Sequence, residues 1–147
     1  MRIERLVTLP AQMDTLRAEA RSEGFRHIED LWQQWQDQKV RFDRPGEILV
    51  CAYAGDELAA VGGITEDFID PAWLRMRRFY VRPQFRRQGV GKAIVDHLLP
   101  TALPLGRPIA LYTDTPQGAA FWEAQGFVPI AREKTTHALP ERGRPLR

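Results

Sequence analysis

The segment 81–95 constrains the fold most, because it joins the end of a predicted strand to an amphipathic helix through a basic bend that contains Gly89 and Gly91. Helix N-termini leave several backbone N–H groups unpaired and carry a partial positive charge. Neither glycine has a side chain, so a phosphate can approach these amides closely. Arg86, Arg87 and Lys92 add positive charge. The segment therefore predicts a pyrophosphate-binding turn.

Two other phosphate-binding loops do not match this bend. A P-loop needs a glycine five residues before its Gly-Lys pair and a Ser or Thr after it, but Arg86 and Ala93 stand at those places. A dinucleotide-binding fingerprint needs a third small residue where Ile94 stands. A purely structural turn, in which the glycines only let the chain bend, stays open as an alternative.

Hydrophobic periodicity along the chain predicts one α+β domain with a mixed, mostly antiparallel sheet. Apolar runs predict strands at residues 1–9, 48–53, 58–65, 74–81, 109–113, 127–132 and 135–139. Apolar residues three and four positions apart predict helices at residues 13–24, 28–35 and 115–125, and a loop that turns into a helix at residues 86–99. We expect Pro100 to end the third helix, and Thr115 and Pro116 to open the fourth. The polar segment 140–147 predicts a frayed tail.

The strand predicted at residues 74–81 carries an unusual number of arginines. Regular alternation of side chains assigns its residues to two faces, with Leu74, Met76 and Arg78 on one and Arg75, Arg77 and Phe79 on the other.

Composition excludes several classes of protein. The 147 residues carry 21 Lys+Arg and 19 Asp+Glu, so the net charge of +2 does not favour nucleic acid as an obligatory partner. The single cysteine, Cys51, lies in an apolar stretch and predicts a buried thiol. No signal pattern or membrane-spanning apolar run is present, so we expect a cytoplasmic protein without a membrane partner. We predict no metal site.

Two motifs in register give the chain a family resemblance. Arg86-Arg87-Gln88-Gly89-Val90-Gly91 follows Phe79-Tyr80-Val81-Arg82-Pro83 and resembles the Arg/Gln-x-x-Gly-x-Gly/Ala signature of the GNAT acetyltransferases. Ala120-Phe121-Trp122-Glu123-Ala124-Gln125-Gly126-Phe127 is similar to that family's last helix. The resemblance covers essentially the whole chain. It implies a single GNAT N-acetyltransferase domain over 1–147, a three-layer fold, and a sheet of about six or seven strands flanked by about four helices.

The resemblance also implies acetyl-CoA as the cosubstrate and a set of residues that bind it. Backbone groups of Phe79, Tyr80 and Val81 would bind the pantetheine arm where strands 74–81 and 109–113 separate. The pyrophosphate would lie against Arg86, Arg87, Gln88, Gly89, Val90, Gly91 and Lys92. Thr115 and Trp122 stand at two further positions that contact the cofactor in the family.

The catalytic groups are less defined, because Trp122 stands where many relatives have an acidic tyrosine, and indole is not a usable acid near neutral pH. The resemblance implies direct attack of an amine on the thioester in a ternary complex, which needs a base. Glu66 is the first candidate and Asp67 the second. Tyr80, Tyr112 or water would then supply the acid, or local dipoles alone would stabilise the departing thiolate.

The acceptor is left open between a small amine and a Lys or N-terminal amine of a protein. We expect it to contact Arg26, Trp32, Trp35, Phe42 and the loop 66–73, where Glu66, Asp67 and Asp70 would favour a cationic amine. The lone histidines His27 and His137 are weaker candidates for a role. The missing tyrosine supports an alternative, an acyl-CoA-binding regulatory module with little catalysis. A nucleic-acid-binding domain is a third reading, and a homodimer is plausible.

Overall fold

The computed structural model describes residues 1–140, and the predicted frayed tail lies outside this range apart from Pro140. Within these residues the sheet has seven strands in the order β1-β2-β3-β4-β5-β7-β6, and only the contact between β4 and β5 is parallel. In chain order the strands are β1 (Arg2–Arg5), β2 (Ile48–Ala54), β3 (Glu57–Glu66), β4 (Leu74–Val81), β5 (Ile109–Leu111), β6 (Val128–Arg132) and β7 (Thr135–Leu139). The predicted mixed, mostly antiparallel sheet is confirmed.

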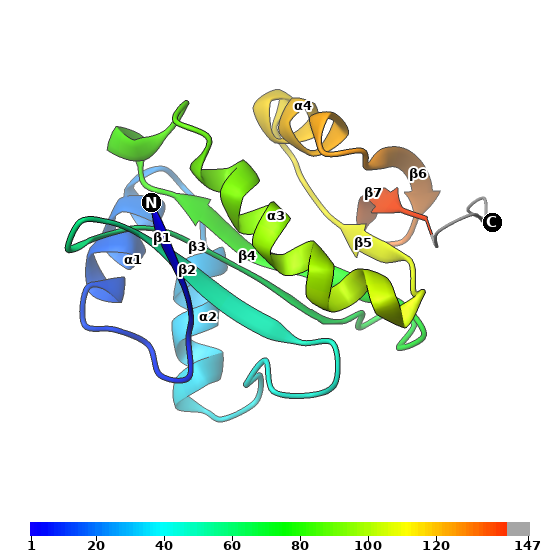
Figure 1. Ribbon diagram of the computed structural model, residues 1–147, viewed down its shortest axis with the longest axis horizontal. Helices are drawn as coiled ribbons and strands as arrows, with labels where there is room; N and C mark the ends of the chain where they lie inside the picture. Colours follow the sequence, from blue (N-terminus) through cyan, green and yellow to red (C-terminus); the bar gives the residue numbers. More distant parts are fainter. Residues whose placement is uncertain (141–147) are drawn as a thin grey trace.

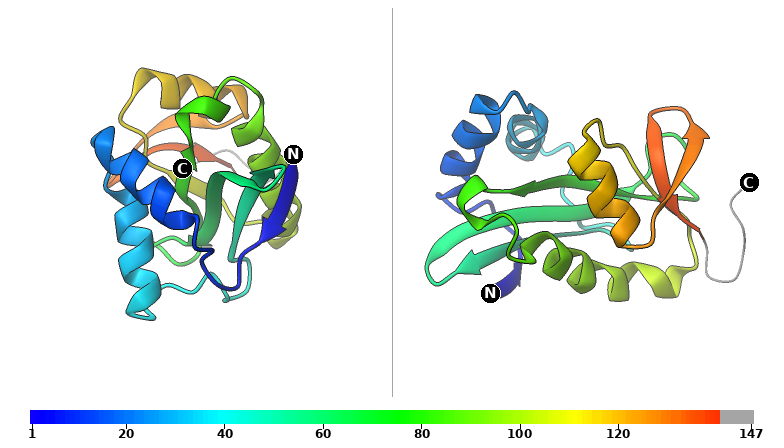
Figure 2. Two further views of the ribbon diagram at one scale, coloured as in Figure 1. Left: turned by 90° about the vertical axis from the view of Figure 1, so that its left-hand side faces the viewer. Right: turned by 90° about the horizontal axis from the view of Figure 1, so that it is seen from above.

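In the described part of the chain, four α-helices cover the two faces of this sheet (Figures 1 and 2). They are α1 (Met13–Ser22), α2 (His27–Gln36), α3 (Val90–Ala102) and α4 (Pro116–Ala124). The helices α1 and α2 pack on one face over Leu49, Cys51 and Val61. The helices α3 and α4 pack on the other. The result is the three-layer fold that the sequence predicted.

Three local predictions are corrected, and the first concerns β1, which ends at Arg5 rather than at Leu9. Pro100 does not end α3, which continues to Ala102. Proline removes one helical hydrogen bond, but Leu98 and Ala102 are fully buried on either side of it, and this packing favours continuing the helix. The strand β5 is also shorter than predicted, because it ends at Leu111.

The predicted burial of the single cysteine is confirmed. Cys51 is fully buried, and burial raises the pKa of its thiol to about 11. Among residues 1–140 no helix has the length and apolarity to cross a bilayer. In the same range no three metal-binding side chains come together.

Candidate active site

The sheet opens between β4 and β5. The two strands pair only at Leu74 with Ile109 and at Arg75 with Ala110, and after Arg75 they separate. A cavity of about 810 Å³ lies at this separation, lined by residues of β4, β5, the start of α2 and the start of α4. The predicted divergence of these two strands is therefore present, and it leaves one edge of β4 without a strand partner.

A β-bulge in β4 shapes this edge. Val61 pairs with Tyr80 but Gly63 pairs with Arg77, so β4 carries one more residue than β3 across this interval. Arg78 has φ = 63°, a left-handed conformation that costs a non-glycine residue about 1–2 kcal/mol. The prediction of regular alternation is wrong here, because Phe79 packs on the same face as Leu74 and Met76.

A glycine of β3 makes room for the bulge. A Cβ on Gly62 would lie 2.9 Å from the ring of Phe79 and 3.0 Å from Ile94, so a larger residue would displace that ring. Two consecutive glycines inside a predicted strand are typical of a bulge or a close backbone approach. The Gly62-Gly63 pair was therefore the sequence signal for this irregularity.

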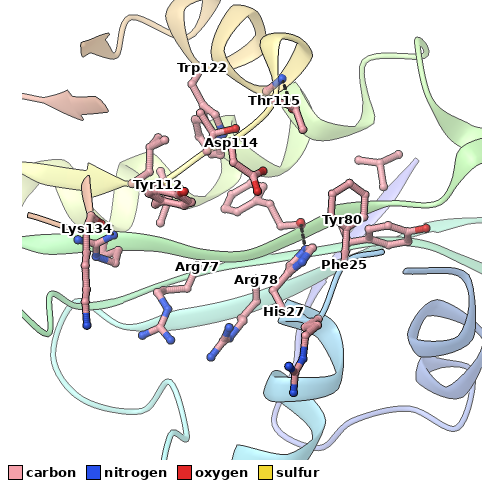
Figure 3. A pocket seen from close by; sticks show the side chains of 18 of the residues that line it. Phe25, His27, Arg77, Arg78, Tyr80, Tyr112, Asp114, Thr115, Trp122 and Lys134 are labelled. Carbon is pink, nitrogen blue, oxygen red and sulfur yellow. Dashed lines mark hydrogen bonds between the residues drawn. The ribbon is translucent and has the colours of Figure 1, made fainter. Parts of the chain in front are cut away.

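His27, at the start of α2, contacts the bulge. Its Nε2–H donates to the backbone carbonyl of Phe79 over 2.7 Å (Figure 3). Burial lowers the pKa of His27 despite this hydrogen bond, so the ring is neutral near pH 7. The histidine thus fixes a carbonyl that the separation of the strands would otherwise leave free, a role that no pattern in the sequence indicates.

The N-terminus of α3 lies beyond the C-terminal end of β4. Gly89 is its N-cap, with φ = 76°, and no atom lies within 4 Å of where its Cβ would be. The first helical bond runs from the amide of Ala93 to the carbonyl of Gly89, so the amides of Val90, Gly91 and Lys92 have no carbonyl within the helix to receive them. An open approach and three free amides fit an anionic group such as a pyrophosphate.

Gly91 has a packing role in addition to the predicted one. A Cβ at this position would lie 3.0 Å from the ring of Phe121, so its missing side chain lets α3 and α4 pack closely. Of these two glycines, Gly89 is the one that faces open space.

The basic side chains of the loop are mostly engaged with the protein. Arg86 donates to the carboxylate of Glu23 over 2.7 and 2.8 Å and to the carbonyl of Val81 over 2.9 Å. Lys92 pairs with Asp96 one helical turn later, and Gln88 donates to the carbonyl of Gln84. Arg87 is exposed, and its side chain makes no ion pair with residues 1–140.

Tyr80 belongs to the same network as Arg86. Its hydroxyl donates to Glu23, and burial together with that carboxylate raises the pKa of the phenol. The hydrogen bond from Arg86, by contrast, lowers the pKa of Glu23. The ring of Tyr80 packs edge-on against Phe25 and His27. The Tyr80 hydroxyl therefore has an anionic partner at the end of α1.

Thr115 and Trp122 both line the cavity, on the side of α4. The hydroxyl of Thr115 accepts from the amide of Gly118 over 2.9 Å, which confirms it as the N-cap of α4. Trp122 is only 7% exposed and packs edge-on against Phe79 and Phe127. Its position between helix and strand makes it part of the wall of the cavity.

The predicted acidic residues do not line this cavity. The carboxylate of Glu66 lies 3.1 Å from Arg44 and 3.5 Å from Arg107. Asp67 is buried between Arg75 and Arg132. Neither of them, nor Asp70, belongs to the cavity lining, so the expected acidic acceptor region is not at this place.

Among the described lining residues, the one carboxylate is instead that of Asp114, which follows β5 and lies beside Tyr112 and Thr115 (Figure 3). No motif in the sequence singled out Asp114, because its position depends on where the short strand β5 ends.

Some of the residues that were predicted to contact the acceptor line the cavity, and others lie elsewhere. Arg26 and Phe68 line the cavity. Phe42 is buried in the core beneath α1 and α2, with Trp35 packed against that core. Trp32 instead lies under the guanidinium of Arg17, 3.9 Å from its ring centre.

The diverging strands and the free amides at a helix N-terminus form a site suited to an extended ligand with an anionic group. Residues 9–127 match the profile of the Acetyltransferase (GNAT) family, and the chain belongs to this family. None of the curated proteins is a significant match.

Solved structures agree with this assignment. A presumed acetyltransferase from Exiguobacterium sp. 255-15 is 26% identical, with a TM-score of 0.86 over 96% of this chain and 93% of that one. The PaiA N-acetyltransferase of Thermoplasma acidophilum, solved with coenzyme A, is 17% identical, with a TM-score of 0.67 over 96% and 99% of the two chains. An aminoglycoside 6'-N-acetyltransferase, also complexed with coenzyme A, is 17% identical, with a TM-score of 0.70 over 99% of each chain.

Proposed function

We propose that this protein is an N-acetyltransferase that transfers the acetyl group of acetyl-CoA to a primary amine in a ternary complex. The observation that carries the proposal is the open approach to Gly89 at the end of an unpaired strand edge. Free amides at the helix N-terminus suit a pyrophosphate, and the open strand edge suits an extended, amide-containing arm. Two structural neighbours hold coenzyme A, which supports the same ligand here.

The residues that would hold the cofactor follow from this arrangement. The amides of Val90, Gly91 and Lys92 and the exposed Arg87 would bind the pyrophosphate, with Gln88 and Arg86 shaping the loop. Backbone groups of Phe79, Tyr80 and Val81 would bind the arm. Thr115 and Trp122 would form its opposite wall.

Bound acetyl-CoA supplies the thioester that the amine attacks. The protein has to bring the amine to the open edge of β4, accept its proton, and allow the coenzyme A thiolate to leave and be protonated as the amide bond forms. Asp114 is positioned for this second task, directly or through water, because it is the described carboxylate that lines the cavity. Glu66 and Tyr80 stay as the base and acid predicted from the sequence, and single substitutions distinguish the three.

The alternative, an acyl-CoA-binding module with little catalysis, is favoured by one observation. Trp122 occupies the position of the usual tyrosine and is packed among aromatic rings, so that position offers no acid. Release of free thiol from acetyl-CoA in the presence of a broad panel of amines separates the two functions. Binding without turnover of any amine would favour the module.

The cofactor site itself is tested by Gly89→Asp, with Gly106→Asp as the matched control. Both glycines have positive φ, 76° and 65°, and open space at the Cβ position, so the two substitutions carry a similar backbone cost. A carboxylate at position 89 would repel the phosphates, and we expect coenzyme A affinity measured by calorimetry to fall at least about tenfold. The control should keep wild-type affinity. Unchanged affinity in Gly89→Asp would remove the proposed site.

A further inference from the structure

The cavity is strongly unbalanced in charge. Its described lining includes one carboxylate, Asp114, and the cationic residues Arg26, Arg75, Arg77, Arg78, Arg86 and Lys134. Two of these cations have carboxylate partners, because Arg75 pairs with Asp67 and Arg86 with Glu23. The others form no salt bridge within residues 1–140.

The bulge in β4 brings two of these unpaired cations together. Consecutive residues of a regular strand point to opposite faces, yet both Arg77 and Arg78 line the cavity. In Figure 3 their side chains extend side by side, and Lys134, from the turn between β6 and β7, extends in the same direction. The left-handed conformation of Arg78 is the local cause, and Gln34 of α2 accepts a hydrogen bond of 2.8 Å from its guanidinium.

The two guanidinium groups are also poorly solvated. Arg77 and Arg78 are each half-buried, and burial lowers the pKa of both, that of Arg77 to about 10. The carboxylate of Asp30 acts on both groups in the opposite direction, but it forms no ion pair with either of them. A charge withdrawn from water without such a pair is unfavourable, and a bound oxyanion would compensate for it. Guanidinium groups bind carboxylate and phosphate oxygens through paired N–H donors.

These cations lie away from the predicted pyrophosphate site. Arg77 precedes Val81 by four residues along β4, and the strand leads from Val81 to the α3 N-terminus. Four residues of strand span roughly 13 Å. Arg78 contacts α2, on the side of the sheet opposite α3. The pair therefore faces the region left for the acceptor.

We propose that the acceptor is an amine that itself carries an oxyanion, and that Arg77 and Arg78, assisted by Lys134, bind that oxyanion. This inference rests on the proposed N-acetyltransferase function. It reverses the cationic acceptor expected from the sequence, since the acidic residues behind that expectation lie outside the cavity. An amino acid, a peptide with a free terminal carboxylate and an amino phosphonate share the required chemistry.

Matched acceptors test the charge requirement. Amino acids are compared with their C-terminal amides, short peptides with their amidated forms, and aminoalkyl phosphonates with neutral amines of the same length, with thiol release as the readout. We expect kcat/KM for the anionic member of a pair to exceed that of the neutral member at least about tenfold. The pair that shows the largest ratio identifies the source of the oxyanion. Equal rates, or a preference for neutral or cationic amines, would overturn the inference and leave the acetyltransferase intact.

Variants then assign the effect to these residues. Arg77→Met removes the charge but retains an apolar side chain of similar length to the arginine stem. Arg78→Asn removes the charge and introduces a residue that tolerates the left-handed conformation. We expect each to raise KM for the anionic amine about tenfold or more, with little change for the amide and unchanged affinity for coenzyme A. Arg5→Met, on the exposed edge strand β1, is the control of equal charge change. A loss of coenzyme A affinity in Arg77→Met would instead show that these cations bind the cofactor, and it would overturn the inference. Absence of coenzyme A binding in the wild-type protein would refute the proposed function itself.

Discussion

Asp67 offers a quantitative test of how the two parts of the sheet are held together. Its side chain is 0% exposed, and its carboxylate accepts from Arg75 Nε over 2.7 Å, from Arg132, and from the amide of Asp70 over 2.9 Å. Arg75 also donates to the carbonyl of Lys134 and the hydroxyl of Thr135, both over 2.8 Å. The cluster therefore ties β4 to the β6–β7 hairpin across β5, at the point where β4 and β5 last pair.

We expect Asp67→Asn to destabilise the protein by about 3–5 kcal/mol, because it leaves buried guanidinium charge without its counter-charge. Burial alone would raise the pKa of Asp67, but the hydrogen bonds from Arg132, Arg75 and the Asp70 amide outweigh it and lower the pKa, so the carboxylate is ionised near pH 7. For a domain of this size the loss corresponds to a Tm about 10 °C lower.

Urea unfolding followed by tryptophan fluorescence is the assay. Trp73 lies 4.0 Å beneath the guanidinium of Arg132 and reports directly on the cluster. The control is Asp43→Asn, the same change at an exposed carboxylate, which should stay within about 0.5 kcal/mol of wild type. The double variant Asp67→Asn/Arg132→Met should lose less free energy of unfolding than the two single variants lose together, because it also removes one of the guanidinium groups that Asp67→Asn leaves without a counter-charge. A loss below about 1 kcal/mol in Asp67→Asn would refute the argument.

Two further predictions concern titration and catalysis. Burial lowers the pKa of His27 below its ordinary value near 6.5, so the unfolded chain binds more protons than the folded one, and stability should fall as the pH drops below about 6.5. His27→Gln, whose amide can still donate to Phe79, should remove this part of the pH dependence in unfolding experiments, and an unchanged slope would contradict the assignment. Asp114, Glu66 and Tyr80 are the three acid–base candidates, and we expect Asp114→Asn to lower kcat at least about tenfold without changing the affinity for coenzyme A. The kcat values of Glu66→Gln and Tyr80→Phe are measured for comparison. Wild-type turnover in Asp114→Asn would return the role to one of the other two.

The periodicity of the sequence was sufficient for the order and type of the elements. Regular apolar spacing fixes which face of α3 is buried, and Thr115 with Pro116 fixes where α4 begins. The glycine-containing bend indicated where the helix begins, and in the structure Gly89 is its N-cap. These features depend on local chemistry, which a sequence displays directly.

The interior of the candidate site could not be predicted in the same way. Arg77 and Arg78 share a side only because of one left-handed residue, and a period-two pattern cannot contain that irregularity. The sequence made Asp67 a candidate for the base, but its buried carboxylate is paired with Arg75 and Arg132, which are distant from each other in the sequence. Asp114 enters the cavity because β5 ends early. Each of these outcomes depends on contacts between separate elements.

The short ladder between β4 and β5 has a consequence for colloidal behaviour. An unpaired strand edge on the outside of a protein is a template for adhesion to other chains. Here the unpaired edge of β4 faces the cavity, and β5 and α4 lie opposite it. These two elements sterically block a strand of a neighbouring molecule from pairing with the edge. The unpaired backbone groups of β4 therefore stay accessible to a thin, extended ligand but not to a strand of another protein molecule.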